Sequence, residues 1–252
     1  MKDELTLSYI NLYAVLRNLE ELCDMDSEAK SLIANKNLSI CFKVKNGPQA
    51  VLSFQNGKCT FSEGSGPCSI KLYFTSPAHL NSMFEGKANP IPLKGLTKIS
   101  FLKNEFTKLT ERLSFYLKPT DALLKDKNYH RLNTILTANT AIFALSQIGN
   151  HDRLGKLNAY RMPDGIISIQ ASDGSLALNV TADHGVLTPK KGKADKPRAI
   201  MEFSDLETAN NLLNGKVDAY TCIATGGIKT RGYVPMLDCF DKLLGMVPRY
   251  LK

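Results

Sequence analysis

The chain has 252 residues, of which 43% are hydrophobic and 22% charged, and its formal net charge is +8. This composition is typical of a globular protein and excludes a fibrous repeat or long disorder, while the length favours two domains over one. No apolar run approaches the roughly 18 residues of a membrane span, and no export signal is recognisable. We therefore expect a cytoplasmic protein whose charge favours an anionic partner.

The cysteines and histidines indicate no metal site. Six cysteines occur without any Cys-x-x-Cys pair, and the four histidines show no spacing with cysteine or acid that would frame a metal ion. We expect free thiols in a reducing compartment, and neither a metal nor another cofactor.

The first half predicts a helix, antiparallel strands, a short helix, a strand and a long helix. Apolar residues at helical spacing from Tyr9 to Leu19 indicate the first helix. Residues 38–44 alternate between apolar and polar, as a strand with one buried face does, and Asn46-Gly47 and Asn56-Gly57 are typical hairpin turns. The long helix carries an apolar stripe of Leu102, Phe106, Leu109, Leu113 and Tyr116.

The second half repeats this order after Pro119-Thr120-Asp121, which marks a boundary. We expect a first module in residues 1–120 and a second in 121–252. Helical spacing recurs between Leu132 and Leu145, strand alternation recurs in residues 176–180, and a final helix carries the apolar stripe Met236, Phe240, Leu243 and Val247.

The clearest sign of a repeat is the run from Phe74 to Gly86, which recurs from Phe203 to Gly215. The offset is constant, since 203 − 74 = 129 and 215 − 86 = 129. In each copy a strand ends in Phe, a polar residue can cap a short helix, and Gly ends it. In the second copy Ser204 and Glu207 have the spacing of a capping box.

The turn dipeptides also recur, but at a different offset. Asp164-Gly165 and Asp173-Gly174 follow the first-half turns by 118 and 117 residues. If these dipeptides are the equivalent hairpin turns, the second copy carries extra residues, which we place in residues 185–197.

The run from Gly226 through Ile228, Lys229 and Arg231 to Gly232, followed by an apolar helix, resembles the sterol carrier protein family. The resemblance covers about residues 128–251 and, through the repeat, about residues 20–117. It implies an α+β fold in which each module is a roughly five-stranded, mostly antiparallel sheet, covered on one face by helices above a hydrophobic tunnel. Members of the family bind fatty acyl chains, acyl-CoA, phospholipids or sterols, and some are accessory domains.

The first copy departs from this pattern, because a run from Pro90 to Gly95 replaces the glycine-rich one. We therefore expect the second copy to bind the ligand. A lipid cavity needs apolar side chains that face inward without filling the space, and methionines suit its deformable wall. The candidate ligand-binding residues are Phe203, Leu206, Leu212, Leu213, Met236, Phe240, Leu243, Leu244 and Met246. The alternative is that these residues fill an ordinary core.

No catalytic pattern is present. The chain contains neither Gly-x-Ser-x-Gly nor a phosphate-cradling Gly-x4-Gly-Lys-Ser/Thr sequence, and Gly86-Lys87 and Gly215-Lys216 end helices instead of opening them. We expect no catalytic residue and no enzyme.

A basic cluster in the second copy has two interpretations, a solvated loop or a contact for an anionic membrane surface. No aromatic residues that would stack on bases interleave with it, so we expect no nucleic acid partner. The cluster consists of Lys190, Lys191, Lys193, Lys196 and Arg198.

Three hypotheses follow. The leading one is non-catalytic binding or transfer of a lipid, or of another hydrophobic small molecule. The second is an accessory or scaffold protein with filled cores that presents a surface to a partner enzyme. The third, an enzyme, requires a cavity lined by buried acids or by several of His79, His130, His151 and His184.

Overall fold

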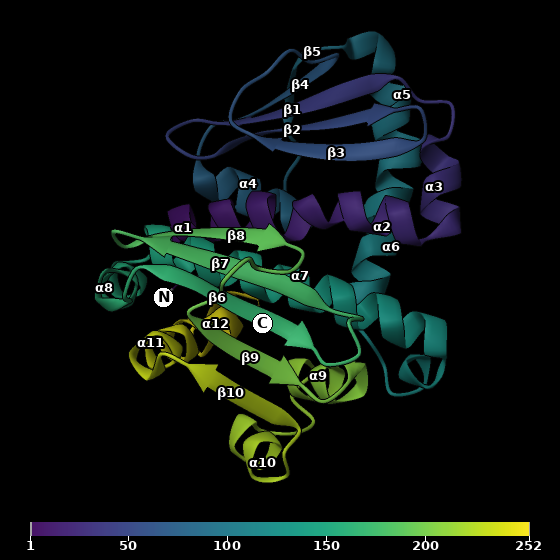
Figure 1. The fold of residues 1–252 in the computed structure, drawn as a ribbon. Helices are drawn as coiled ribbons and strands as arrows, with labels where there is room; N and C mark the ends of the chain where they lie inside the picture. The colour runs from purple at the N-terminus through teal and green to yellow at the C-terminus, as the bar shows by residue number, and fades with distance from the viewer. Residues whose placement is uncertain (1, 252) are drawn as a thin grey trace. The chain divides into compact units, whose positions relative to one another are not determined.

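The computed structural model describes residues 2–251. The chain divides into two compact units, Met1–Pro119 and Thr120–Lys252. The division lies one residue before the boundary expected from the sequence. Each unit contains one five-stranded sheet together with helices (Figure 1).

In the first unit, helical segments precede and follow the strands of the sheet along the chain. Those before the sheet are α1 (Glu4–Ile10), the π-helical η1 (Asn11–Val15), the 3-10 helix η2 (Leu16–Asn18), α2 (Leu19–Met25) and α3 (Ser27–Ile33). The strands are β1 (Leu38–Val44), β2 (Gln49–Gln55), β3 (Lys58–Glu63), β4 (Ile70–Phe74) and β5 (Ile91–Lys94), with α4 (Pro77–Phe84) between the last two. The closing segments are η3 (Leu96–Lys98), α5 (Ile99–Phe101), the π-helical η4 (Leu102–Phe106) and α6 (Thr107–Leu117).

The strand order of this sheet is β3-β2-β1-β4-β5. Three of its four pairings are antiparallel, while β1 and β4 are parallel. The parallel pair arises because the chain leaves β3 at one edge and returns across the sheet to the other side of β1. The sheet is therefore mixed. The sequence predicted its mostly antiparallel character but not the parallel pair.

The second unit has the same strand arrangement. Its helical segments before the sheet are η5 (Leu123–Lys125), α7 (Lys127–His151) and α8 (Arg153–Arg161). The strands are β6 (Gly165–Ala171), β7 (Ala177–Asp183), β8 (Val186–Lys191), β9 (Ala199–Phe203) and β10 (Ile228–Gly232). Between and after the last two strands come α9 (Leu206–Leu213), α10 (Ala219–Ala224), α11 (Val234–Leu244) and α12 (Val247–Leu251).

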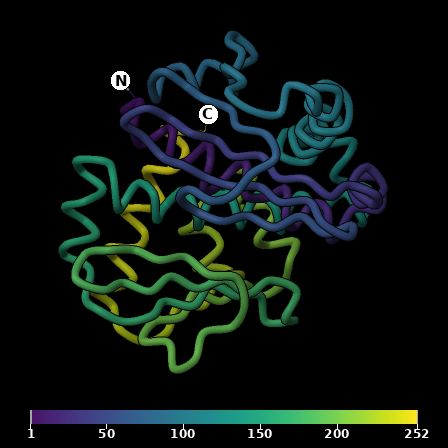
Figure 2. Tube along the Cα trace, turned by 90° about the horizontal axis from the view of Figure 1, so that it is seen from above, coloured from purple at the N-terminus to yellow at the C-terminus, as the bar shows by residue number. Residues whose placement is uncertain are grey.

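The strand order of the second sheet is β10-β9-β6-β7-β8, again with one parallel pair, β6 with β9. Figure 2 shows the consecutive green strands β6, β7 and β8 lying side by side. The two parallel pairs even share a register, since Val44 lies opposite Phe74 and Ala171 opposite Phe203. Strands β1 and β6 have the same pattern of buried positions, as do β2 and β7.

The sequence matched the hairpin turns of the two halves incorrectly, because it took Asp164-Gly165 and Asp173-Gly174 as the two turns of the second half. The β6–β7 turn contains Asp173-Gly174 and the β7–β8 turn contains His184-Gly185, whereas Asp164-Gly165 precedes the hairpin and opens β6. The offsets from the first-half turns are then 173 − 46 = 127 and 184 − 56 = 128. No insertion is needed, because residues 186–191 are strand β8. His184 has a left-handed φ of 47°, and it was overlooked because Asn-Gly and Asp-Gly are the strongest sequence signals for such turns.

The short helices α4 and α9 begin at equivalent residues. The Ser76 side chain accepts the His79 amide at 3.1 Å, and the Asp205 side chain accepts the Thr208 amide at 2.7 Å. Since 205 − 76 = 129, the caps obey the repeat. The predicted capping box at Ser204 is therefore wrong by one residue.

The six cysteines are free thiols, five of them buried. Within residues 2–251, no helix is both long and apolar enough to cross a membrane.

Gly95, which follows strand β5, tolerates no side chain for two reasons: its backbone conformation and the lack of space around its Cα atom. Its φ is 85°, and a Cβ atom would lie 2.5 Å from the Ser69 carbonyl oxygen. Gly64 has the same φ of 85° but nothing within 4 Å of the Cβ position. We expect Gly64→Ala to cost about 1–2 kcal/mol, the strain of a left-handed alanine. Gly95→Ala should cost clearly more in urea unfolding, and equal losses would contradict the close approach of β5 to the β4 side of the sheet.

Candidate functional site

An apolar pocket of about 820 Å³ lies in the first unit between its sheet and its final helical segments. Phe42 of β1 and Leu72 of β4 line it from the sheet, and Phe106 and Leu113 line it from the helical side. The other lining residues are Val15, Leu16, Met83, Phe84, Asn89, Pro90, Pro92, Ile99, Leu102, Lys103, Thr107, Thr110, Glu111, Ser114, Leu117 and Lys118.

The sheet wall of the pocket follows from strand alternation. Phe42 and Leu72 are partners in the parallel β1–β4 register, so their side chains share the face that the helices cover. Both are nearly inaccessible, with exposed fractions of 1% and 3%. The wall is therefore rigid and apolar.

The helical wall comes from the predicted apolar stripe. Leu109, Leu113 and Tyr116 are buried, while Leu102 and Phe106 are half-buried and face the pocket. The Phe106 ring lies 6.2 Å from the Phe42 ring and 6.4 Å from the Phe101 ring, centroid to centroid. The stripe thus meets the sheet through aromatic contacts and leaves space beside them.

Charged groups occur only toward the outside of the lining. Lys103, Glu111 and Lys118 are exposed, and the exposed Asn89 and Pro92 complete this side. An apolar interior with a charged rim is suited to a ligand that has an apolar body and a polar end.

Asp26 holds the final helix α6 in place. Its two carboxylate oxygens accept hydrogen bonds from Arg112 Nε at 2.5 Å and Arg112 Nη2 at 2.7 Å. The Tyr116 hydroxyl donates to the same carboxylate at 2.8 Å, and so does the Ala29 amide, so Asp26 also caps α3. One buried side chain therefore joins α6 to the helices before the sheet.

The protonation of Asp26 reflects this environment. Burial acts to raise its pKa, but the hydrogen bonds from Arg112, from the Ala29 amide and from Tyr116, with the charge of Arg112, outweigh burial and hold the pKa below its usual value. Asp26 is consequently an anion at neutral pH.

A second tie lies near the other end of the same helical run. Lys36 Nζ lies 2.6 Å from Glu105 Oε1 of η4, and this bond lowers the pKa of Glu105. The pocket-lining residues Phe106 and Thr110 lie between the two ties in sequence.

The predicted ligand-binding residues of the second unit occupy a different setting. Met236, Phe240 and Leu243 of α11 are fully buried, and α11 packs against α7, α8 and β9. Phe203 and Met246 are buried, whereas Leu206, Leu212, Leu213 and Leu244 are half-buried. None of the nine lines either of the two pockets described here, and their contact with a ligand stays a prediction.

The second unit nevertheless repeats part of the Asp26 arrangement. The Tyr250 hydroxyl of α12 donates to Asp152 at 2.6 Å, and Asp152 caps α8 through the amides of Leu154 and Gly155. In both units a tyrosine near the end of the module thus bonds the aspartate that caps the helix before the sheet. The first unit adds Arg112 as a further partner of its aspartate, Asp26.

The basic cluster is not a single loop, because Lys190 and Lys191 belong to strand β8. All five of its residues are exposed. Arg198 is tied down, since Nη1 donates to the Asp164 carbonyl at 2.7 Å and the guanidinium lies 4.2 Å from the centre of the Tyr233 ring. Membrane contact by the cluster stays a prediction.

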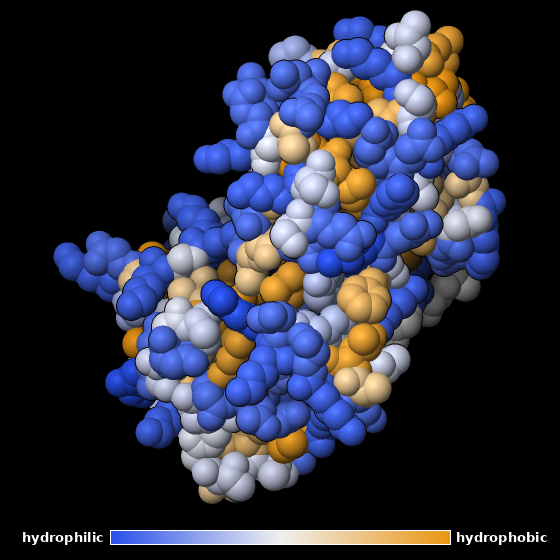
Figure 3. All heavy atoms as spheres, turned by 90° about the vertical axis from the view of Figure 1, so that its right-hand side faces the viewer, coloured by the Kyte–Doolittle hydropathy of each residue, from blue (hydrophilic) through white to orange (hydrophobic). Residues whose placement is uncertain are grey.

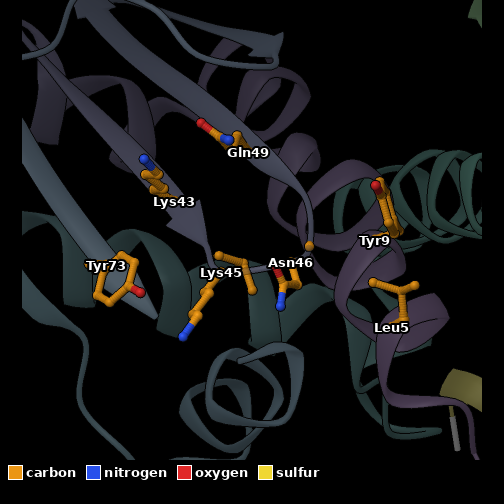
Figure 4. Close-up of a pocket in the computed structure, with 9 residues that line it drawn as sticks. Leu5, Tyr9, Lys43, Lys45, Asn46, Gln49 and Tyr73 are labelled. Atoms are coloured by element: carbon orange, nitrogen blue, oxygen red, sulfur yellow. The ribbon is translucent and has the colours of Figure 1, made fainter. Parts of the chain in front are cut away.

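A second pocket, of about 520 Å³, lies beside the β1–β2 turn and is lined largely by polar side chains. Figure 4 shows Lys43 and Lys45 pointing in opposite directions, with Tyr73 on the neighbouring strand. Because the two ammonium groups do not converge, the recess forms no cradle for an anion.

Asp164, Asp183 and His184 bring potential metal ligands within 4.8 Å of one another on the surface. His184 Nδ1 already lies 2.5 Å from Asp183 Oδ1, and this contact, with the charges of Asp164 and Asp183, raises the pKa of His184. His184 thus lies between two carboxylates with which it can form ion pairs at a surface turn.

Sequence reasoning missed the buried polar residues that organise each unit. Asn81 of α4 bonds Asn11 at 2.9 Å, and Asn210 of α9 bonds Asn133 at 2.8 Å. Since 210 − 81 = 129, Asn81 and Asn210 occupy equivalent positions of the repeat, and this identity could have drawn attention to them. Asp26 carried no comparable signal, because its partners lie 86 and 90 residues away.

No family model matches the chain, and no curated protein matches it. Sterol carrier protein domains are among the solved structures that are similar to part of it. The UbiJ-SCP2 ubiquinone synthesis protein has 13% identity and a TM-score of 0.35, covering 44% of this chain and 95% of its own. Sterol carrier protein domain 2 of Helicoverpa armigera has 16% identity and a TM-score of 0.35, covering 44% and 87%. Apo sterol carrier protein 2 of Yarrowia lipolytica has 18% identity and a TM-score of 0.31, covering 41% and 92%.

Removal of the Asp26 charge should loosen α6. Because the folded-state pKa is depressed, its contribution to stability is present above the usual value of 3.8 and is lost as pH falls through the folded value. We expect Asp26→Asn to destabilise the unit by about 1.5–3 kcal/mol at neutral pH, the range for a hydrogen bond to a charged group. The difference should shrink below pH 3.8. Hydrogen exchange of the α6 amides measures both effects.

The matched control is Glu85→Gln, which removes an exposed carboxylate paired with Lys87 in the same unit. It should leave exchange in α6 unchanged. Equal protection of α6 in Asp26→Asn and wild type would show that the helix is held by packing alone.

Proposed function

We propose that the first unit binds the apolar chain of a lipid, of the fatty acyl, acyl-CoA, phospholipid or sterol-like class, in the pocket between its sheet and its final helix. The observation that carries the proposal is the pocket itself: its volume of about 820 Å³ lies within the roughly 300–1,000 Å³ typical of small-molecule sites.

The chemistry of the lining supports an apolar ligand. Phe42, Leu72, Phe106 and Leu113 present carbon surfaces from both sides, and each methylene that a ligand buries there contributes about 0.8 kcal/mol. Met83 adds a flexible side chain that adapts to ligands of different shape.

We further propose that the role is binding and not catalysis. The titratable side chains of the lining are Lys103, Glu111 and Lys118, all exposed at the rim, and neither pocket lining includes a histidine. A general acid or base works within hydrogen-bond reach of the reacting group, usually in a desolvated setting that tunes its pKa. Exposed rim charges suit the polar end of a lipid better.

We also infer that the two units are tandem copies of one sterol-carrier-like module. Support comes from the shared strand order, the shared register of the parallel pair, the offsets of 127 to 129 between turns and caps, and the paired Asp–Tyr bonds. We place ligand binding in the first unit because the apolar pocket of about 820 Å³ lies there, whereas the sequence favoured the second unit.

A bulky residue in the pocket should compete with the ligand. Thr110 of α6 is half-buried and lines the pocket. We expect Thr110→Phe to weaken binding of NBD-labelled stearate by roughly tenfold or more, which corresponds to about 1.4 kcal/mol of lost contact. A fluorescence titration of the purified full chain measures the affinity, after native mass spectrometry has shown whether a lipid co-purifies.

The matched variant is Leu244→Phe, which adds bulk to a half-buried residue of α11 in the second unit. It should leave the affinity unchanged. If Leu244→Phe abolishes binding and Thr110→Phe does not, the ligand site lies in the second unit. A wild-type chain that carries no lipid and ignores the probe would contradict the proposed function altogether.

A further inference from the structure

Residues 87–104, called the edge segment here, run along the pocket and are entirely free of acidic residues. They contain Lys87, Lys94, Lys98 and Lys103 and no aspartate or glutamate. The segment includes the edge strand β5 and contributes six residues to the pocket lining: Asn89, Pro90, Pro92, Ile99, Leu102 and Lys103. Lys87 is paired with Glu85, and Lys94 Nζ donates one hydrogen bond to the Cys68 carbonyl at 2.8 Å, which leaves its other N–H donors available. A basic surface that includes Lys94, Lys98 and Lys103 therefore borders the apolar pocket.

The same segment exposes large apolar side chains. Ile91, Leu93 and Leu96 have exposed fractions of 41%, 56% and 64%. Figure 3 shows that hydrophobic side chains also reach the surface among hydrophilic ones on one face of the molecule. Exposed apolar residues that occur together, unlike single ones, indicate an interaction surface.

The backbone of the segment explains why these side chains point outward. Lys94 and Pro92 pair with consecutive residues of β4, Lys71 and Leu72, so Leu93 is an extra, bulged residue. A bulge redirects the side chain it carries. Pro92 shares the covered face with Leu72 and lines the pocket, which leaves Leu93 outside it.

Strand addition by a second copy of the chain is disfavoured at this edge. Pro90 and Pro92 have no backbone N–H to donate to another strand, and prolines and lysines protect edge strands from pairing. An occupant must instead accept apolar side chains and lysines together without backbone pairing. The interface of a bilayer with anionic headgroups meets that requirement.

We propose that the edge segment docks the first unit on an anionic phospholipid bilayer. Ile91, Leu93 and Leu96 enter the boundary between headgroups and acyl chains, and Lys94 and Lys98 lie among the lipid phosphates. The adjacent pocket then receives its ligand from the bilayer. This loading step rests on the proposed lipid pocket, whereas docking does not.

The test is flotation of the full chain with vesicles of phosphatidylcholine, with and without phosphatidylserine. Wild-type protein should float with the anionic vesicles and dissociate as ionic strength rises. Leu93→Ser/Leu96→Ser should weaken binding by roughly tenfold or more, since two apolar side chains no longer insert. Lys94→Gln/Lys98→Gln should weaken it about fivefold per lysine, the equivalent of about 1 kcal/mol each.

The control is Val186→Ser/Val234→Ser, which removes two apolar side chains that are exposed on separate elements, 58% on β8 and 70% on α11. It should bind vesicles like wild type. Loss of binding in this control with retention in Leu93→Ser/Leu96→Ser would overturn the proposal, and so would a wild-type chain that ignores anionic vesicles. Binding of NBD-labelled stearate in the absence of vesicles is measured for every variant. Intact docking without stearate binding would uphold the docking surface and contradict the lipid pocket.

Discussion

The pocket of the first unit depends on how Asp26 fixes α6. A helix laid across a sheet normally gains its stability by burying its apolar stripe, which closes the space beneath it. Here Arg112 and Tyr116 are bonded to one buried carboxylate, and Lys36 holds Glu105 toward the other end of the run. Charge-assisted hydrogen bonds fix the position of the helix without requiring close contact along its length. The apolar residues between the ties can therefore line a space instead of filling it.

The second unit shows the other outcome of the same topology. It keeps the tyrosine bond to the capping aspartate, through Tyr250 and Asp152, but has no arginine there. The longer helix α11, which precedes α12, is anchored by Met236, Phe240 and Leu243, all fully buried. Burial of one such side chain contributes about 1.5–3 kcal/mol, so packing adds strongly to the Tyr250–Asp152 bond. Two modules with one strand order thus hold their closing helices by different combinations of forces.

The sequence predicted the features that local patterns encode. Strand alternation, the apolar stripe from Leu102 to Tyr116 and the Phe74–Gly86 repeat each reflect periodicity or chain stereochemistry within a short window. Features that depend on distant partners were not predictable: the parallel β1–β4 pair, the bond of Asp26 to Arg112 and the Asn81–Asn11 contact. The turn error arose because the β7–β8 turn is formed by His184-Gly185 and not by the Asn-Gly or Asp-Gly dipeptides that signal such turns most strongly.

The run from Pro90 to Gly95, which replaces the glycine-rich pattern of the second half, forms an edge strand with a different structure. In the second unit, the equivalent strand β10 pairs regularly with β9, begins with the buried Ile228 and places Arg231 against Glu202. In the first unit, β5 is bulged, contains Pro92, directly follows Pro90 in the chain, and has all four residues exposed. The bulge and Pro92 therefore leave the apolar side chains of Ile91 and Leu93 exposed at the edge beside the pocket, whereas the regular pairing of β10 with β9 places the apolar Ile228 in the interior.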